Sequence, residues 1–353
     1  MIKIFKISFI VLVLIFINSQ QGFAQYTSKK VKSKHQVYTD SLKSVEYNYT
    51  FPILGQAAYK QGFDIPYPIG IMGNFIWMDQ GIVIDNMQLG FSGANRDVSL
   101  TPVDFIDFGD NRNTSYAYNV RPDIWIFPFL DVYGIFGAGQ SKTEVNLVAP
   151  VELKSVVTQQ ITTAGFGLMT AFGVGPVWVS VDANWTWNKP ELLDKAVLVN
   201  ILGLRVGHTF TFKNRPDRNI ALWAGGMRAK MSSETNGAIS MADAFPDETW
   251  DRGEEIGQTY DDWYDGLGPV MKDKVDNSAF PDIIDGIRNN DRDGSSTIYY
   301  GMDKQVTQMW NGVVGMQFQL NKHWQIRTEA GIFGDRKSWL VSINYRFLGF
   351  KKK

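Results

Sequence analysis

The chemistry open to this chain lies mainly in charged side chains on the polar side of alternating segments. In such a segment, every second residue shares one face of a strand. The charged residues expected on the polar faces are Arg121, Asp123, Asp182, Arg205, Arg327, Glu329 and Arg346. Enclosed charges must pair or stay hydrated. Opposed acidic and basic walls could orient a polar solute in transit, whereas a salt-bridge lattice of the same residues would plug a narrow interior.

Enzyme chemistry finds little support in the sequence. The histidines are His35, His208 and His323, and none lies in a long loop expected to face outward. A histidine beside Ser or Asp is the usual base for hydrolysis, and the nucleophile, phosphate-loop and His-rich metal motifs are missing. Acidic pairs between residues 243 and 265 have the residue types for glycoside chemistry, but acidic solvation explains them better. We expect no enzyme activity and no cofactor.

One stretch has the oxygen spacing of a calcium loop. Asn289, Asp291 and Asp293 precede Gly294, as in loops of the EF-hand type. The twelfth position is Tyr300 instead of the bidentate Glu, and Asp-Gly turns are common in polar loops. These residues are a weak calcium candidate, and no other metal site is expected.

Composition excludes several classes of protein. The chain has no cysteine, which excludes disulfides, thiol catalysis and cysteine-bound metals. A formal net charge of −1 gives no electrostatic footprint for nucleic acid. Aromatic residues are plentiful, yet mean hydropathy is slightly negative. Membrane β-barrels combine these properties, because every second strand residue is polar.

The elements that would position the charged residues are alternating strands, which are clearest near the C-terminus. One face of the last segment is apolar and carries Trp339, Val341, Ile343, Tyr345 and Phe347. Its other face carries Ser342, Asn344 and Arg346. The segment is about ten residues long with an aromatic near each end, as a strand tilted across a bilayer requires. The absence of charge on the apolar face favours lipid outside and a polar interior.

Other segments show the same alternation with varying clarity. The predicted strands are 69–78, 82–92, both sides of a turn at 128–131 within 120–140, 161–173, 177–187, 198–212, 220–230, 310–320 and 324–332. A further strand within 44–60 would complete an even number, about twelve. Short turns at 79–81, 128–129, 173–176 and 321–322 would then share the periplasmic side. The long connections 93–117, 141–158 and 231–303 would face outside.

The longest connection, 231–303, is acidic and breaks the strand period. Trp250, Ile256, Tyr260, Trp263 and Leu267 recur at steps of three and four residues, which suggests an amphipathic helix. A second short helix would carry Ile283, Ile284 and Ile287 on one face. Long loops without structure are unusual. The insertion is therefore either a folded cap tucked into the barrel mouth or a solvated loop that shields the rim.

The N-terminal residues resemble an export signal. Lys3 and Lys6 precede an apolar run over 7–17, and Gly22-Phe23-Ala24 provides a cleavage site. Residues 1–24 are thus expected to be a signal peptide, and 25–43 a disordered, basic periplasmic tail. Prolines within 61–68 would interrupt any ladder there, and the stretch could bend into the lumen or seal one mouth.

The chain resembles the outer-membrane β-barrels of Gram-negative bacteria over 44–347. The resemblance rests on the signal peptide, the terminal hairpins and a last strand ending Asn344-Tyr345-Arg346-Phe347. The segment 121–134 is similar to one in uncharacterised, porin- or transporter-like members. The basic tail 348–353 departs from the class, whose members usually end on the aromatic that insertion machinery reads; Phe347 or Phe350 could serve instead.

The resemblance implies an all-β, transmembrane, antiparallel up-and-down barrel in the outer membrane. Lipid and the barrel-insertion machinery would be its partners, and no substrate is implied. Two functions remain open. One is a channel or facilitator for small polar solutes through a charge-lined lumen. The other is a non-transporting, surface-binding or structural barrel that acts through the acidic, aromatic-rich insertion 231–303.

Overall fold

The computed structural model is a closed antiparallel β-barrel and describes residues 34–92, 98–174, 176–232 and 234–352. Ten strands form the ring, which closes where β14 (Lys337–Phe347) pairs with β1 (Ile69–Ser92). The strands between them, in ring order from β1, are β4 (Asn111–Phe127), β5 (Leu130–Ala149), β6 (Leu153–Val174), β7 (Val177–Pro190), β8 (Val197–Phe212), β9 (Arg215–Met231), β12 (Trp310–Gln319) and β13 (Trp324–Phe333).

The two ends of the barrel differ. The connections β4–β5, β6–β7, β8–β9 and β12–β13 are short and lie at one end, together with the start of β1 and the end of β14. We call this the short-turn end. The other end, the insertion end, carries the excursion 232–309 between β9 and β12, which are direct neighbours in the ring.

The outer face of the ring is apolar. On β8, Leu202, Leu204, Val206 and Phe210 are 40–53% exposed, whereas the intervening Arg205 is buried. Exposed tryptophans lie toward both margins: Trp324 near the short-turn end, and Trp77, Trp187, Trp310 and Trp339 toward the insertion end. An apolar band between aromatic margins is the lipid-facing surface of a membrane barrel. The protein is therefore an outer-membrane β-barrel of the Gram-negative type.

Beyond the tryptophan margin at the insertion end, the polarity of the sheet reverses. On β5 the outward Lys142 and Glu144 pair at 2.7 Å, while the inward Val145 and Leu147 line the interior. This part of the wall faces water outside and encloses an apolar core. We call it the collar; it comprises 82–92, 140–160, β10 (Glu234–Ser240) and β11 (Thr297–Val306).

The collar is built by a change of strand partner. β1 pairs with β14 from Ile69 to Asp79 and with β11 from Ile82 to Ser92. β10 continues the sheet beyond β11. Two short strands, β2 (Thr101–Pro102) and β3 (Asp107–Phe108), add to β1 and β5.

A helical cap, residues 241–288, closes the collar. Its helices are α4 (Met241–Ala244), α5 (Asp247–Asp251), α6 (Gly253–Asp265), α7 (Pro269–Asp276) and α8 (Phe280–Arg288). The amphipathic helix expected from Trp250 to Leu267 corresponds to α6, but Trp250 lies in the separate α5 and Leu267 lies beyond the end of α6. The second expected helix is α8.

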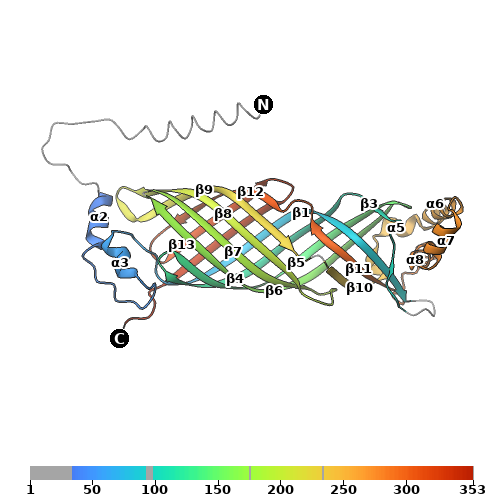
Figure 1. Cartoon of the computed structure of the whole chain (residues 1–353), viewed down its shortest axis with the longest axis horizontal. Coiled ribbons are helices and arrows are strands. Elements are labelled where there is room, and N and C mark those ends of the chain that lie inside the picture. Colours follow the sequence, from blue (N-terminus) through green and yellow to red (C-terminus); the bar gives the residue numbers. More distant parts are fainter. Residues whose placement is uncertain (1–33, 93–97, 175, 233, 353) are drawn as a thin grey trace, which may run out of the picture.

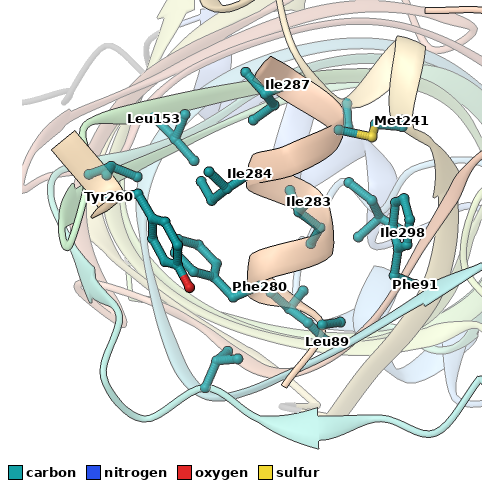
Figure 2. Close-up of a cluster of buried hydrophobic side chains, with 14 of the residues drawn as sticks. Leu89, Phe91, Leu153, Met241, Tyr260, Phe280, Ile283, Ile284, Ile287 and Ile298 are labelled. Carbon is teal, nitrogen blue, oxygen red and sulfur yellow. The ribbon is translucent and has the colours of Figure 1, made fainter. Parts of the chain in front are cut away.

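Helix α8 fills the collar with an apolar face. Pro281 in the first turn and Arg288 in the last suit a helix start and end. Phe280, Ile283, Ile284 and Ile287 lie at steps of three and four residues and are at most 3% exposed. Figure 2 shows them among side chains from β1, β6 and β11: Leu89, Phe91, Leu153 and Ile298.

The N-terminal segment lies at the short-turn end (Figure 1). Residues 34–42 form α2 (Lys34–Leu42), so this part of the expected disordered tail is helical. The expected strand within 44–60 is wrong, because α3 (Gly55–Lys60) occupies its second half. Lys322 binds Asp64 at 3.0 Å, and Tyr49 forms a bridge to Lys351 of the basic tail. The proline-containing segment 61–68 thus contacts the rim of the short-turn end.

Several predicted boundaries need correction. The ring has ten strands instead of about twelve. The expected turn at 79–81 lies within the unbroken β1, where Asp335 accepts a hydrogen bond from the Gly81 amide at 2.6 Å. The expected loop 141–158 is mostly strand, and 93–117 becomes strand at Asn111. The turn at 128–129 is confirmed. The signal peptide 1–24 and residues 25–33 lie outside the described residues.

Among helices in the described part of the chain, none is both long and apolar enough to cross a membrane.

Arginine substitutions on β6 should distinguish the two environments of the sheet. Leu168 faces outward within the ring, and Thr158 faces outward within the collar. Leu168→Arg should lower the free energy of unfolding by about 2–4 kcal/mol, because it places a charge in lipid. Thr158→Arg should change it by less than about 0.5 kcal/mol. Denaturant unfolding from lipid vesicles measures both, and equal costs would contradict the reversal of polarity.

Candidate functional site in the barrel lumen

A cavity of about 550 Å³ runs along the inside of the barrel. We call it the lumenal chamber; its lining along β5 extends from Tyr133 to Leu147. Toward the short-turn end the walls are polar and include Asn74, Asn119, Arg121, Asp182, Asn184, Arg205, Arg327 and Glu329. Toward the insertion end they are mainly apolar and include Ile84, Leu89, Val145, Leu153, Val199, Met231, Phe280 and Ile298. The chamber is therefore amphipathic along its length.

The first group of floor charges centres on Arg205. Its Nε and Nη2 atoms donate to the two carboxylate oxygens of Glu329 at 2.6 and 2.8 Å, and Nη1 donates to Asp182. Glu329 also accepts from Arg327 at 3.0 Å and from the Trp223 indole at 2.7 Å. Bidentate Arg–carboxylate contacts of this kind are strong and geometrically specific. Two cations and two anions thus neutralise one another.

A second group of floor charges lies nearer the short-turn end. Arg346 donates to Asp123 at 2.7 Å and to the Tyr67 carbonyl at 2.7 Å. Arg121 lies 3.5 Å from Asp131 and stacks its guanidinium 3.7 Å from the centroid of the Tyr133 ring. This group is also balanced in charge. Together the two groups, which we call the floor lattice, cross the barrel and form the floor of the chamber.

All the charged residues selected from the sequence point into the barrel, but they divide between these two groups. Arg121, Asp182, Arg205, Arg327 and Glu329 line the chamber. Asp123 and Arg346 lie below it and do not line it. Sequence reasoning missed three partners in the lattice: Asp131, Tyr133 and Trp223. Asp131 had been placed in a turn, and the segment of Trp223 alternates poorly.

Lys304 on β11 is a further residue that sequence reasoning missed. It lines the chamber within the collar, and its Nζ lies 3.4 Å from Thr143 Oγ1. Burial lowers the pKa of the Lys304 ammonium from its ordinary 10.5 to about 8. No acidic side chain lies within ion-pair distance of it among the described residues.

The calcium candidate is a self-contained turn. Asp293 accepts from the Ser295 amide at 2.8 Å, and Asp291 accepts from the Ser296 hydroxyl. Gly294 has a φ of 77°, which favours glycine. Across the ranges that the structure describes, no group of three or more His, Cys, Asp or Glu side chains is arranged to hold a metal.

Neither His323 nor His208 lies at the chamber. His323 sits in the β12–β13 connection, where its Nδ1 is 2.7 Å from the Arg346 carbonyl oxygen. His208 on β8 packs on Phe210. Neither residue belongs to the chamber lining.

Comparison with known proteins gives no family assignment. No family model and no curated protein matches the chain. Similar solved structures include the β-domain of the Bordetella autotransporter BrkA, with 8% identity, 79% of this chain and 100% of that chain covered, and a TM-score of 0.36. Another is the translocator domain of the autotransporter NalP from Neisseria meningitidis, with 12% identity, coverage of 89% and 100%, and a TM-score of 0.33.

The P. putida toluene transporter TodX is also similar, with 6% identity, coverage of 80% of this chain and 91% of that chain, and a TM-score of 0.26. Similarity at TM-scores this low carries no inference about substrate or activity.

Removing one member of the floor lattice should cost more than removing a charge-balanced pair. Arg205→Met should lower the free energy of unfolding by about 3–5 kcal/mol, because Asp182 loses its cation and the group keeps one unbalanced buried negative charge. Adding Asp182→Asn should recover part of that loss, because the remaining Arg327–Glu329 pair is neutral. Arg112→Met, which removes partly exposed pairs with Asp79 and Asp335, should cost about 1 kcal/mol or less. Chemical denaturation measures all three variants, and a double variant less stable than Arg205→Met alone would contradict the lattice.

The depressed pKa of Lys304 should make stability depend on pH. Between pH 8 and 10.5 the unfolded chain holds a proton that the folded protein has released, so the free energy of unfolding should rise with pH in this window. The full shift corresponds to roughly 3 kcal/mol. The difference between wild type and Lys304→Met isolates this contribution from other titrating groups. A difference that is flat from pH 7 to 10.5 would show that Lys304 is not desolvated.

Proposed function

We propose that the protein is a gated outer-membrane facilitator that takes a small amphipathic molecule into the lumenal chamber. The observation that carries the proposal is the chamber itself, with a polar floor and apolar upper walls. A pocket of this size, mostly apolar with a few converging polar groups, is typical of small-molecule sites. A purely polar solute in a charge-lined lumen accounts for the floor only, because the collar walls are apolar.

Orientation follows from the usual asymmetry of outer-membrane barrels. Their periplasmic turns are short and their extracellular loops are long. By that rule the short-turn end faces the periplasm, and the cap faces the outside. A molecule would then enter beneath the cap and leave past the floor lattice.

The cap has the attachments expected of a gate. The chain enters the cap from β10 and leaves it into β11. Apolar contacts bury α8 of the cap in the collar. Polar ties from the cap to the wall include Ser155 Oγ to the Ala244 carbonyl at 2.6 Å and Lys274 to Asp104 at 2.9 Å. The second tie is exposed and contributes little to stability. Apolar burial therefore holds the cap closed, and an amphipathic molecule could compete for it.

The alternative function, surface binding through the insertion, loses most of its aromatic component. Trp250, Tyr260 and Phe280 are buried in the core of the collar and cap, and Trp263 and Tyr264 are partly buried against it. The exposed charges of the cap are mainly acidic, with Asp247 and Asp251 largely exposed beside Arg292. An acidic surface alone is also what a solvated cap presents, so the chamber carries the proposal.

Excising the cap tests the gate directly. Ser240 of β10 is paired with Thr297 of β11, so residues 241–296 can be replaced by a two-residue Asn-Gly turn. Val199→Cys then reports on the chamber, because the natural chain has no cysteine. A charged, membrane-impermeant thiol reagent should label Val199→Cys about tenfold faster or more without the cap, since access no longer awaits its opening.

A lipid-facing control separates access from general damage to the barrel. Val181→Cys points outward on β7 and should label slowly with or without the cap. Planar-bilayer recordings complete the test. If neither the intact nor the capless protein shows conductance or solute flux, the proposed facilitator function is wrong.

A further inference from the structure

Lys304 is the feature of the chamber that the floor lattice and the gate leave unexplained. It projects from β11, opposite Ile84 of β1, and its ammonium lies beside Thr143 of β5 on the inner face of the wall. The other cations of the lining are paired: Arg205 and Arg327 with Glu329, and Arg121 with Asp131. Within the described ranges, Lys304 lines the chamber without a carboxylate in contact. A partly buried ammonium enclosed in a chamber of this kind favours an anionic partner.

The hydroxyl groups near Lys304 are arranged to donate. Asn113 Nδ2 donates to Ser141 Oγ at 2.6 Å and to Thr143 Oγ1 at 2.9 Å. Each hydroxyl oxygen thus already accepts, and the hydroxyl hydrogen stays available as a donor. Ser141 and Thr143 are both buried and line the chamber. The ammonium of Lys304 and these hydroxyls offer charge-assisted hydrogen bonds, which suit a carboxylate.

The surrounding walls determine the rest of the ligand. Next to Thr143 on the same face of β5 are Val145 and Leu147, and next to Lys304 on β11 is Met302. A wholly polar anion would leave these apolar surfaces uncovered, and a plain hydrocarbon would leave Lys304 without a counter-ion. Methionine side chains adapt to ligands of variable shape.

We infer that the chamber binds an amphiphile with a carboxylate head, and that Lys304 is its counter-ion. The inference rests on the proposed function and names its substrate class. Thr143 and Ser141 position the head, and the apolar collar walls hold the tail.

Binding to the full-length protein in lipid nanodiscs tests the inference. The probes are octanoate, octan-1-ol and octylammonium, which share a tail and differ in charge, and equilibrium dialysis against empty nanodiscs corrects for partition into lipid. At pH 7 wild type should bind octanoate about tenfold or more tightly than octan-1-ol, as expected for hydrogen bonds to a charged group. Octylammonium should bind most weakly.

Variants at one position and a matched control assign the effect. Lys304→Met should weaken octanoate binding by about tenfold or more and leave octan-1-ol binding within about twofold. Lys304→Arg should retain octanoate binding within a few-fold. Lys142→Met is the control, since Lys142 lies on the outer face of the collar beside Glu144 and should leave octanoate binding unchanged.

The outcomes separate the two proposals. If wild type binds none of the probes, the chamber is not a site for amphiphiles, and the proposed function fails with the inference. If octan-1-ol binds as tightly as octanoate, or Lys304→Met binds octanoate like wild type, only the carboxylate inference is overturned. Should Lys304→Met fail to fold, the probe series on wild type and Lys304→Arg still decides, and tighter binding of octylammonium overturns the inference.

Discussion

Closure of the hydrogen-bonded ring is the constraint on which the rest of the structure depends. Lipid offers backbone amides and carbonyls no partners, so a spanning sheet must have no free edge. Pairing of β1 with β14 from Ile69 to Asp79 meets this condition within the membrane. Because β1 continues past that point, its further length needs a new partner, which β11 supplies. The collar thus arises because β1 extends beyond its pairing with β14.

The outer face of one sheet therefore contacts lipid along the ring and water along the collar. Within the ring its outer face meets lipid and its inner face holds the floor lattice. Within the collar the outer face carries Lys142 and Glu144, and the inner face packs on α8. The chamber spans this change, which is why it is polar at its floor and apolar above. The site is amphipathic because it lies where the polar interior of the ring meets the apolar interior of the collar.

The same reversal explains what could be predicted from the sequence. Strands β7, β8 and β12–β14 were identifiable because their outward residues are apolar and uncharged. Residues 141–158 alternate as regularly, but with Lys142 and Glu144 outside, so they resembled a solvated loop. The polar run at 79–81 resembled a turn, because the ring strand leaves lipid there while β1 continues into the collar without a break.

The site was predictable in part for a related reason. Strand parity indicates that Arg205 and Glu329 point inward, but they are 124 residues apart, and the pairing of β9 with β12 brings their strands near each other. Trp223 could not be assigned to Glu329 without that pairing. Asp131 lies on the strand next to that of Arg121 and was missed because it had been placed in a turn. Lys304 lay at the boundary of a predicted loop, where no alternation marked it as enclosed. Lys304 is notable because no carboxylate of the described residues contacts it, and a local sequence pattern cannot indicate this.

The placement of the excursion 232–309 has a consequence for how such proteins can diversify. Its flanking strands, β9 and β12, are hydrogen-bonded neighbours, with Arg228 opposite Trp310. The transmembrane ring is thus complete without the excursion. A different excursion could therefore be joined to the same ring. A single recombination between β9 and β12 could exchange the excursion, and with it the ligand preference, while the transmembrane ring stays the same.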